Sequence, residues 1–489
     1  MNTNFCLRRL RRLVPVALVL LAAGCGTDEA GKLPITTSSD EAREYYLQGR
    51  DLVERLRGQD SKEYFEKAIA ADSNFAAAHL QLAFAQTTPG EFFYHFDRAK
   101  ALMGSISEGE RLWIQAVEAG NNGYPMRQRD LMQELVAMYP NDERMHGLLG
   151  NFYFGQQDWQ LAIEQYEQAI GINPKFTQPY NQLGYAYRFL EQYDKAEDAF
   201  RKYIKLIPDD PNPYDSYAEL LMKMGKFNAS IESYERALGF NPNFVPSHVG
   251  IASNLNFKGK YEKARKQLKR LLETARNDGE RRQAWFATAV SYADEGNLDK
   301  ALDALKEQYL LAVNADDAAA RVADLSNMGF TLLEMGKPGE AQVLFDSAQT
   351  VMGASDLSDD IKANNRRFCL YCGGRAALVK GDLEAARRLA GDYRDAVEAL
   401  QNRFQVFLAY ELDGRIALAD GDYDGAITNL EQANLQNPYV YYLLGMAHEG
   451  KGETEQARQL YRRVAAFNQV NSLNLAFIRL KAASKAESL

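Results

Sequence analysis

The chain has 489 residues, of which 46% are hydrophobic and 25% are charged, and it carries a formal net charge of −9 at pH 7. A chain of this length and apolar content can bury enough surface to fold stably. The acidic balance opposes non-specific binding to nucleic acid or to anionic lipid, because both attract clusters of Lys and Arg. We therefore expect no nucleic-acid partner.

Residues 1–24 have the pattern of an export signal. Four arginines precede an apolar run over residues 13–23: Arg8, Arg9, Arg11 and Arg12. The run is too short for a membrane-spanning helix, which needs about twenty apolar residues. We predict a signal peptide that is removed by cleavage. Its loss lowers the number of basic residues from 57 to 53 against 66 acidic residues, so the mature chain carries about −13.

The end of this segment, Leu21-Ala22-Ala23-Gly24-Cys25, resembles the lipobox of bacterial lipoproteins. The resemblance implies that Cys25 is lipidated and becomes the first residue. Gly26 stands where an aspartate retains many Gram-negative lipoproteins in the inner membrane, so we expect an outer-membrane anchor facing the periplasm. Residues 25–41 would form a flexible tether with a mean reach of roughly 20 Å. Two alternatives are an ordinary signal peptide with a chance cysteine and a cytoplasmic protein with a fortuitous apolar start.

The strongest pattern in the chain is a spacing of 34 residues. A small residue, a second small residue, an aromatic residue and a proline recur in that order, as Gly150, Ala162, Tyr166 and Pro174, as Gly184, Ala196, Phe200 and Pro208, and as Ala218, Ser230, Tyr234 and Pro242. A fixed period of roughly 20 to 50 residues is typical of a stacked-repeat solenoid.

Each repeated position suggests a helical hairpin. A glycine inside a helix costs roughly 1 kcal/mol relative to alanine, so its recurrence indicates close packing against a small residue of the partner helix, such as Ala162. A second glycine follows the first helix, as in Gly225-Lys226-Phe227, where it suits a left-handed cap. Proline then stops the second helix, because it lacks the backbone donor.

These residues resemble the tetratricopeptide repeat family, and the match is best over residues 143–278. The resemblance implies an all-α fold, a right-handed superhelix (α-solenoid) of about twelve helical hairpins. Over residues 42–278 the hairpins begin every 33 or 34 residues. Over residues 279–489 the intervals lengthen to as many as 45 residues, which predicts longer helices or connections. The apolar spacing of residues 471–489 predicts a C-terminal capping helix.

Cys369 and Cys372 form the most chemically suggestive pair. In this register they fall inside a first helix, where residues three apart have Cβ atoms about 5–6 Å apart, farther than the about 3.8 Å of a disulfide. We favour buried thiols over a strained disulfide. The five histidines are scattered, and His146 and His248 fall at packing positions. The sequence has no metal-binding spacing, nucleophile motif or phosphate loop, so we expect no metal, no cofactor and no enzyme activity.

Each first helix has a second face that does not pack within its hairpin, and packing does not dictate which residues occupy that face. In the family this face lines a concave groove, and the resemblance places nine residues of the central repeats there: Asn151, Phe154, Asn181, Tyr185, Arg188, Phe189, Asn212, Asp215 and Glu219. Amides, an arginine and aromatic rings interleave, as suits an extended or helical peptide. We predict that they bind a partner. Joint replacement of Tyr185, Arg188 and Phe189 by alanine should weaken partner capture without changing thermal unfolding.

We expect a lipid-anchored scaffold or adaptor of the bacterial envelope that binds proteins or peptides and contacts the membrane through its anchor. The alternative is a surface glycan- or nutrient-binding lipoprotein, since starch-binding lipoproteins also contain these repeats. Such proteins have few repeats and large insertions, whereas repeats run here from about residue 42 to 470. The three tryptophans, Trp113, Trp159 and Trp285, are far apart in sequence. The alternative therefore ranks second.

Overall fold

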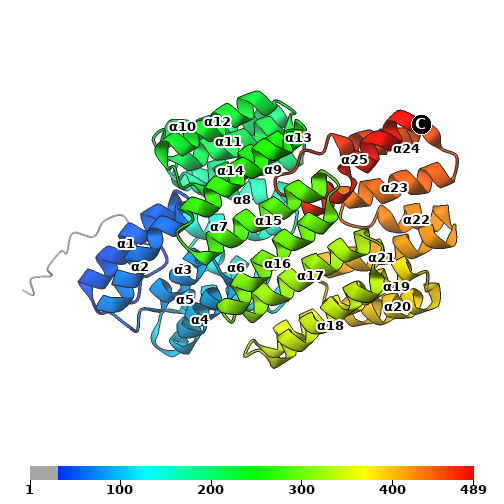
Figure 1. Cartoon of the computed structure of the whole chain (residues 1–489). Coiled ribbons are helices and arrows are strands. Elements are labelled where there is room, and N and C mark those ends of the chain that lie inside the picture. Colours follow the sequence, from blue (N-terminus) through cyan, green and yellow to red (C-terminus); the bar gives the residue numbers. More distant parts are fainter. Residues whose placement is uncertain (1–30) are drawn as a thin grey trace, which may run out of the picture.

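A computed structural model describes residues 31–489, and the predicted signal peptide and Cys25 lie outside this part of the chain (Figure 1). Residues 31–489 form 25 α-helices, one 3-10 helix and no strand. The first 24 helices pair as twelve hairpins, because each odd-numbered helix packs on the next even-numbered one. The predicted all-α architecture and number of hairpins are confirmed.

The helices of the first seven hairpins are 10 to 15 residues long. They are α1 (Asp40–Glu54), α2 (Gly58–Ala71), α3 (Ala76–Ala85), α4 (Pro89–Ala101), α5 (Glu108–Asn121), α6 (Pro125–Met138), α7 (Glu143–Gly155), α8 (Trp159–Ile172), α9 (Gln178–Phe189), α10 (Tyr193–Leu206), α11 (Pro211–Lys223), α12 (Phe227–Phe240), α13 (Val245–Phe257) and α14 (Tyr261–Thr274). The 3-10 helix η1 (Met103–Ser105) precedes α5.

Several of the helices after residue 278 are longer, up to the 22 residues of α19. They are α15 (Asp278–Asp294), α16 (Leu298–Asn314), α17 (Ala318–Glu334), α18 (Pro338–Ala354), α19 (Asp359–Lys380), α20 (Leu383–Glu398), α21 (Arg403–Asp420), α22 (Tyr423–Leu430), α23 (Pro438–Gly450), α24 (Thr454–Ala465) and α25 (Leu473–Ser488). The longer sequence intervals therefore correspond to longer helices. The four helices α15 to α18, which form two hairpins, are each 17 residues long.

In several hairpins a glycine inside the first helix leaves room for an aromatic ring of the second helix. A Cβ atom built on Gly150 would lie 2.5 Å from the ring of Tyr166, and one on Gly184 would lie 2.5 Å from the ring of Phe200. Both rings are completely buried. The partner residue that demands glycine is thus the large aromatic one. The nearby alanine, such as Ala162, is also fully buried, but it is not the residue that requires glycine on the first helix.

The turn inside most hairpins uses a left-handed residue. Gly225 has φ of 74° and Gly296 has φ of 88°, as predicted for the glycine caps. Gln157 and Glu191 occupy the same place in two hairpins with φ of 61° and 58°. A residue with a Cβ atom pays a conformational cost in this region, which glycine avoids.

A side chain at the fourth position of four consecutive hairpins binds the proline that ends the preceding one. The imidazole Nε2 of His146 lies 3.1 Å from the carbonyl oxygen of Pro140, six residues earlier. The same contact is made by Tyr180 to Pro174, Tyr214 to Pro208 and His248 to Pro242. The prediction that His146 and His248 are satisfied packing residues is confirmed.

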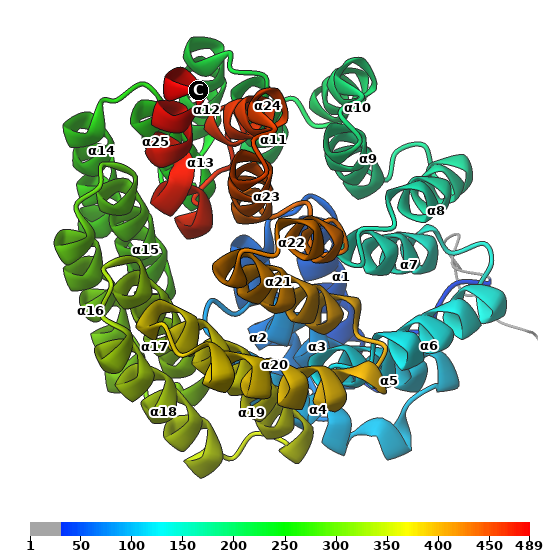
Figure 2. The ribbon, with the colours of Figure 1, turned by 90° about the vertical axis from the view of Figure 1, so that its right-hand side faces the viewer.

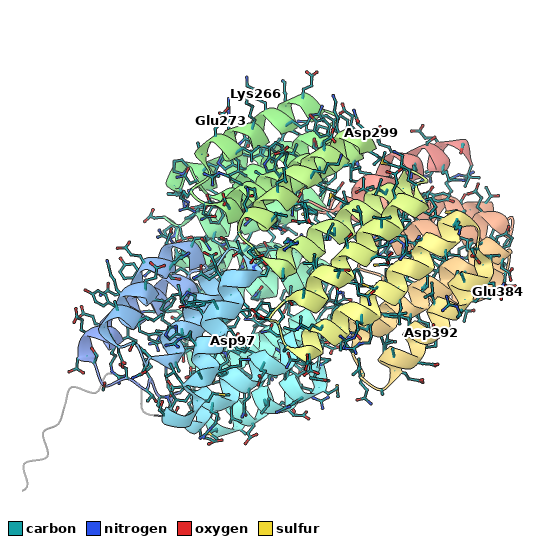
Figure 3. All side chains as sticks on the ribbon, turned by 60° about the horizontal axis from the view of Figure 1, so that its bottom comes forward. Asp97, Lys266, Glu273, Asp299, Glu384 and Asp392 are labelled. Atoms are coloured by element: carbon teal, nitrogen blue, oxygen red, sulfur yellow. The ribbon has the colours of Figure 1, made fainter. Side chains whose placement is uncertain are left out.

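The hairpins coil so that first helices line the inner side and second helices form the outer side, as α7 and α8 or α17 and α18 show (Figure 2). First helices of neighbouring hairpins also pack on each other, for example α11 on α13 and α13 on α15. The outer helices carry exposed charges, among them Asp97, Lys266, Glu273, Asp299, Glu384 and Asp392 (Figure 3). Specific side-chain chemistry is therefore sought on the inner side.

Distant parts of the chain meet where the coil returns upon itself. The amide of Gly90 donates to Asp317 Oδ2 at 2.8 Å, across 227 residues. Arg403 Nη1 donates to Asp158 Oδ1 at 2.7 Å, across 245 residues. The predicted capping helix is α25, which packs on α24 and also on α15. The C-terminal helix thus covers the last hairpin and joins it to the middle of the solenoid.

Residues 32–39, predicted as part of a free tether, instead pack against the solenoid. The amide of Leu33 donates to Asp142 Oδ2 at 2.9 Å, and Lys32 Nζ lies 2.7 Å from Glu143 Oε2. The amide of Thr36 donates to Glu110 Oε1 at 3.0 Å. The tether prediction is wrong for these residues, because carboxylates near the starts of α5 and α7 bind their backbone and side chains. We call residues 32–39 the strap.

Candidate binding surfaces on the inner side

Two of the nine predicted groove residues are buried between helices. Asn181 and Asp215 are each only 4% exposed. Asp215 Oδ1 accepts a hydrogen bond from Ser247 Oγ at 2.7 Å, and burial raises the pKa of this carboxyl well above its usual range. Their prediction as ligand contacts is wrong, because neighbouring first helices pack side by side and cover these positions.

Two further amides on this face bind the buried tyrosines of the hairpins. Asn151 Oδ1 accepts from the hydroxyl of Tyr166 at 2.9 Å, and Asn212 Oδ1 accepts from the hydroxyl of Tyr203 at 3.1 Å. Both asparagines remain partly exposed. Each therefore satisfies a buried hydroxyl group, which would otherwise cost free energy without a partner.

Tyr185, Arg188 and Glu219 form one connected group between α9 and α11. The hydroxyl of Tyr185 donates to Glu219 Oε1 at 3.0 Å, and Arg188 Nη1 lies 3.3 Å from Glu219 Oε2. The Tyr185 ring packs edge-on against Phe200, with centroids 5.3 Å apart. Replacing Tyr185 would therefore disturb the packing of two hairpins, so the triple alanine variant should change thermal unfolding.

Phe154 and Phe189 belong to a half-buried aromatic cluster that includes Trp159. Trp159 stacks on Phe189 with ring centroids 4.5 Å apart and an interplanar angle of 10°. Phe154 lies edge-on to both, at 5.0 and 5.8 Å. The guanidinium carbon of Arg188 lies 4.9 Å from the Phe189 ring centroid. We call Phe154, Trp159 and Phe189 the aromatic cluster. Trp159 was not among the predicted groove residues, because it begins a second helix, outside the positions assigned to the groove.

A cavity of about 620 Å³ lies among the first four hairpins, α1 to α8, which we call the first turn of the coil. Inner helices α1, α3, α5 and α7 supply most of its walls, and the strap supplies Leu33, Pro34 and Ile35. Of the predicted groove residues only Asn151 lines it. This cavity was not predicted from the sequence, because its position depends on the strap folding back over hairpins that lie as many as 111 residues away.

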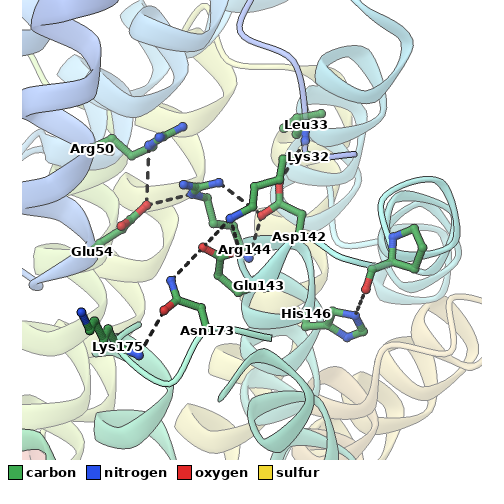
Figure 4. Close-up of polar contacts among 11 residues, drawn as sticks. Lys32, Leu33, Arg50, Glu54, Asp142, Glu143, Arg144, His146, Asn173 and Lys175 are labelled. Atoms are coloured by element: carbon green, nitrogen blue, oxygen red, sulfur yellow. Dashed lines mark hydrogen bonds and ion pairs between the residues drawn. The ribbon is translucent and has the colours of Figure 1, made fainter. Parts of the chain in front are cut away.

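The charged groups of the cavity neutralise one another (Figure 4). Arg144 Nε donates to Glu54 Oε1 at 2.8 Å, and Arg50 Nε lies 3.6 Å from the same oxygen. Arg144 Nη1 lies 3.3 Å from Asp142 Oδ1. Burial disfavours the charge on Arg144, but Glu54 and Asp142 outweigh it and raise the pKa of the guanidinium. Arg144 therefore remains charged and paired.

Residues 31–489 contain two further features that suggest chemistry, a cysteine pair and a histidine pair. Cys369 and Cys372 are free thiols, in agreement with the prediction, and burial raises the pKa of Cys369 to about 11. His79 and His95, on the two helices of one hairpin, approach to 3.4 Å between their Nδ1 atoms. No group of three or more metal-ligating side chains occurs in this part of the chain. None of its helices combines the length and apolarity that a bilayer crossing requires.

Comparison with known families finds repeats along the solenoid. Models described as TPR repeat or tetratricopeptide repeat match residues 150–189, 177–210, 212–244, 249–319 and 417–476. A TPR repeat-containing protein of Methanocaldococcus jannaschii is 25% identical over 339 residues, covering 64% of this chain and 54% of that protein. An anaphase-promoting complex subunit of Schizosaccharomyces pombe is 23% identical, covering 42% and 35%. The matches thus span about half or less of these relatives.

Two solved structures have local similarity to the chain. YrrB, described as a TPR protein with an unusual peptide-binding site, is 19% identical and covers 38% of this chain and 97% of its own, with a TM-score of 0.26. MamA is 21% identical and covers 34% and 94%, with a TM-score of 0.28. Each of these chains corresponds to only part of the solenoid.

Proposed function

Because this chain belongs to the tetratricopeptide repeat family, we propose that it is a lipid-anchored scaffold of the bacterial envelope, which binds partner proteins or peptides on its inner side and has no chemistry of its own. Repeats of this family suit protein and peptide binding, and the lipobox-like residues before Gly26 support the anchor. The proposed location is the outer membrane, facing the periplasm. Membrane contact would be made through lipidated Cys25.

The aromatic cluster carries this proposal. Phe154, Trp159 and Phe189 are half-buried, whereas the rings that hold the hairpins together, such as Tyr166, are completely buried. Partly exposed aromatic rings beside an arginine supply the contact area and the cation typical of binding hot spots. The cluster spans two hairpins, so an extended or helical segment could contact both.

Crosslinking in the intact envelope, followed by identification of the captured proteins, tests the proposal. Joint replacement of Phe154, Trp159 and Phe189 by alanine should abolish partner capture, while Tyr94→Ala, which removes an outer ring that is 64% exposed, should leave it unchanged. Circular dichroism and thermal unfolding establish that both variants fold. Undiminished capture by the folded triple variant would contradict the site.

The same preparation separates this proposal from the alternatives. Retention of oligosaccharides without any protein would favour the glycan- or nutrient-binding lipoprotein. Fractionation of the wild type and Cys25→Ala tests the anchor. We expect the wild type in the outer-membrane fraction and the variant released from it. A chain that is soluble in both forms would contradict the anchor. Its recovery from the periplasm would then indicate an ordinary signal peptide, and its recovery from the cytoplasm would indicate a chain that is not exported.

A further inference from the structure

We propose that the cavity in the first turn binds an uncharged, largely apolar small molecule that carries hydrogen-bond-accepting oxygen atoms. Its volume of about 620 Å³ lies within the range of small-molecule sites, roughly 300 to 1,000 Å³. The cavity uses residues other than the aromatic cluster, so this inference goes beyond partner binding and does not depend on it.

Apolar side chains form most of the cavity wall. They come from every inner helix of the first turn and from α6, and include Val53, Phe84, Val117, Met132, Leu148 and Phe152. Small-molecule sites have this character, with a few polar groups that orient the ligand. An apolar ligand would gain free energy by removing this surface from water.

The charged groups of the wall already have partners within the protein. Glu110, only 2% exposed, accepts hydrogen bonds from the amides of Thr36 and Ser107, both at 3.0 Å. Arg144 is paired with Glu54 and Asp142, as described above. A charged ligand would have to break these pairs or leave its own charge buried without a partner, and either is costly. The site therefore favours an uncharged molecule.

Two residues of the wall carry buried donors that lack hydrogen-bond partners among the described residues. The donors are the indole Nε1 of Trp113, a residue only 7% exposed, and the amide Nδ2 of Asn121. Both residues belong to α5 and line the cavity. Buried polar atoms in proteins rarely remain without a partner. A carbonyl or ether oxygen of a ligand would satisfy these donors once the side chains turn their nitrogen atoms toward the cavity.

Two fluorescent probes test the chemical class. Prodan is an uncharged naphthalene ketone, and anilinonaphthalene sulfonate is an anionic probe of similar ring size. The mature full-length chain should bind one prodan saturably, with binding to the sulfonate weaker by about tenfold or more. Glu54→Gln should strengthen sulfonate binding by about tenfold, because Arg144 then loses its closest carboxylate partner.

Filling the cavity locates the bound probe. Ala77→Trp places a large ring into the space, so prodan binding should weaken by about tenfold or more. Val343→Trp is the matched control, since Val343 is 63% exposed on α18. Val53→Trp fills the cavity from α1 and replaces Ala77→Trp if the latter does not fold. Trp113→Phe keeps an aromatic ring but removes the indole donor, and should weaken prodan binding several-fold.

Three results would overturn the proposal. They are the absence of saturable prodan binding, prodan affinity unchanged in a folded cavity-filling variant, and sulfonate binding as tight as prodan binding in the wild type. Partner capture should continue in the cavity-filling variant and fail in the aromatic-cluster variant. Failure of one hypothesis is therefore distinguishable from failure of the other.

Discussion

Arg479 joins the last helix to the middle of the solenoid by binding Asp294 with two nitrogen atoms. Its Nε donates to Oδ1 at 2.7 Å and its Nη2 donates to Oδ2 at 2.6 Å, across 185 residues. Asp294 is 4% exposed on its side chain and Arg479 is 11% exposed. The pair therefore lies between α25 and α15, where both side chains are largely shielded from water.

Breaking this pair should destabilise the chain. Arg479→Met leaves a buried carboxylate without its cation, and we expect a loss of about 3 kcal/mol in the free energy of unfolding. The double variant with Asp294→Leu should recover most of the loss, because the unpaired charge is then absent. Lys481→Met, on the same helix but 52% exposed, should cost less than about 1 kcal/mol. Denaturant unfolding measures all three, and equal losses for Arg479 and Lys481 would contradict the prediction.

Lys223 should make stability depend on pH in the alkaline range. Its Nζ donates to the carbonyl oxygen of Phe467 at 2.8 Å, and burial lowers the pKa of the ammonium to about 8. In the unfolded chain the pKa is higher, so between these values the unfolded state binds more protons and stability rises with pH.

We therefore compare the wild type with Lys223→Met at different pH values. The free energy of unfolding of the wild type should rise by about 2 kcal/mol relative to the variant between about pH 7.5 and 9.5. Using the difference cancels the titration of tyrosines common to both proteins. A difference that stays constant over this range would show that the ammonium titrates normally.

Replacing glycine by alanine should destabilise the fold at a left-handed turn and stabilise it inside a helix. Gly296 has φ of 88° with no atom within 4 Å of an added Cβ, so Gly296→Ala should cost about 1 kcal/mol through backbone strain alone. Gly391, in the middle of α20, has equally open space. Gly391→Ala should stabilise by about 0.5–1 kcal/mol. Thermal and denaturant unfolding decide the sign of each effect.

The strap should be protected from hydrogen exchange. The amides of Leu33 and Thr36 donate to carboxylates of low exposure, and Glu110→Leu removes the acceptor of Thr36. Exchange at Thr36 should then become about tenfold faster. Glu108→Leu, which changes a neighbouring exposed carboxylate, is the control. Rapid exchange of this segment in the wild type would mean that the strap does not stay bound.

The thiols of α19 should be reduced but unreactive in the folded protein. Burial raises the pKa of Cys369 to about 11 and that of Cys372 well above its usual range, so little thiolate forms near neutral pH. In a chain that begins at Gly26, two thiols should react with a chromogenic disulfide reagent after denaturation and neither should react quickly before it. Failure to detect thiols after denaturation would indicate a disulfide.

The hairpins could be predicted from the sequence because their determinants are close together in the chain. Gly150 meets Tyr166, sixteen residues later, and the same packing requirement recurs in the next hairpin. The residues of the candidate groove were harder to predict. Their position on a first helix followed from the period, but the burial of Asn181 and Asp215 depends on how closely the next inner helix approaches.

The sequence by itself determined the all-α hairpins, their number, the glycine turns and the capping helix, since these depend on packing between neighbouring segments. Only the tertiary structure decided which distant segments meet: the strap against α5 and α7, with the cavity that it helps to line, and Arg479 against Asp294. The physical reason is that a solenoid accumulates small rotations from hairpin to hairpin. The sum of those rotations, which no single repeat encodes, sets where the coil returns upon itself.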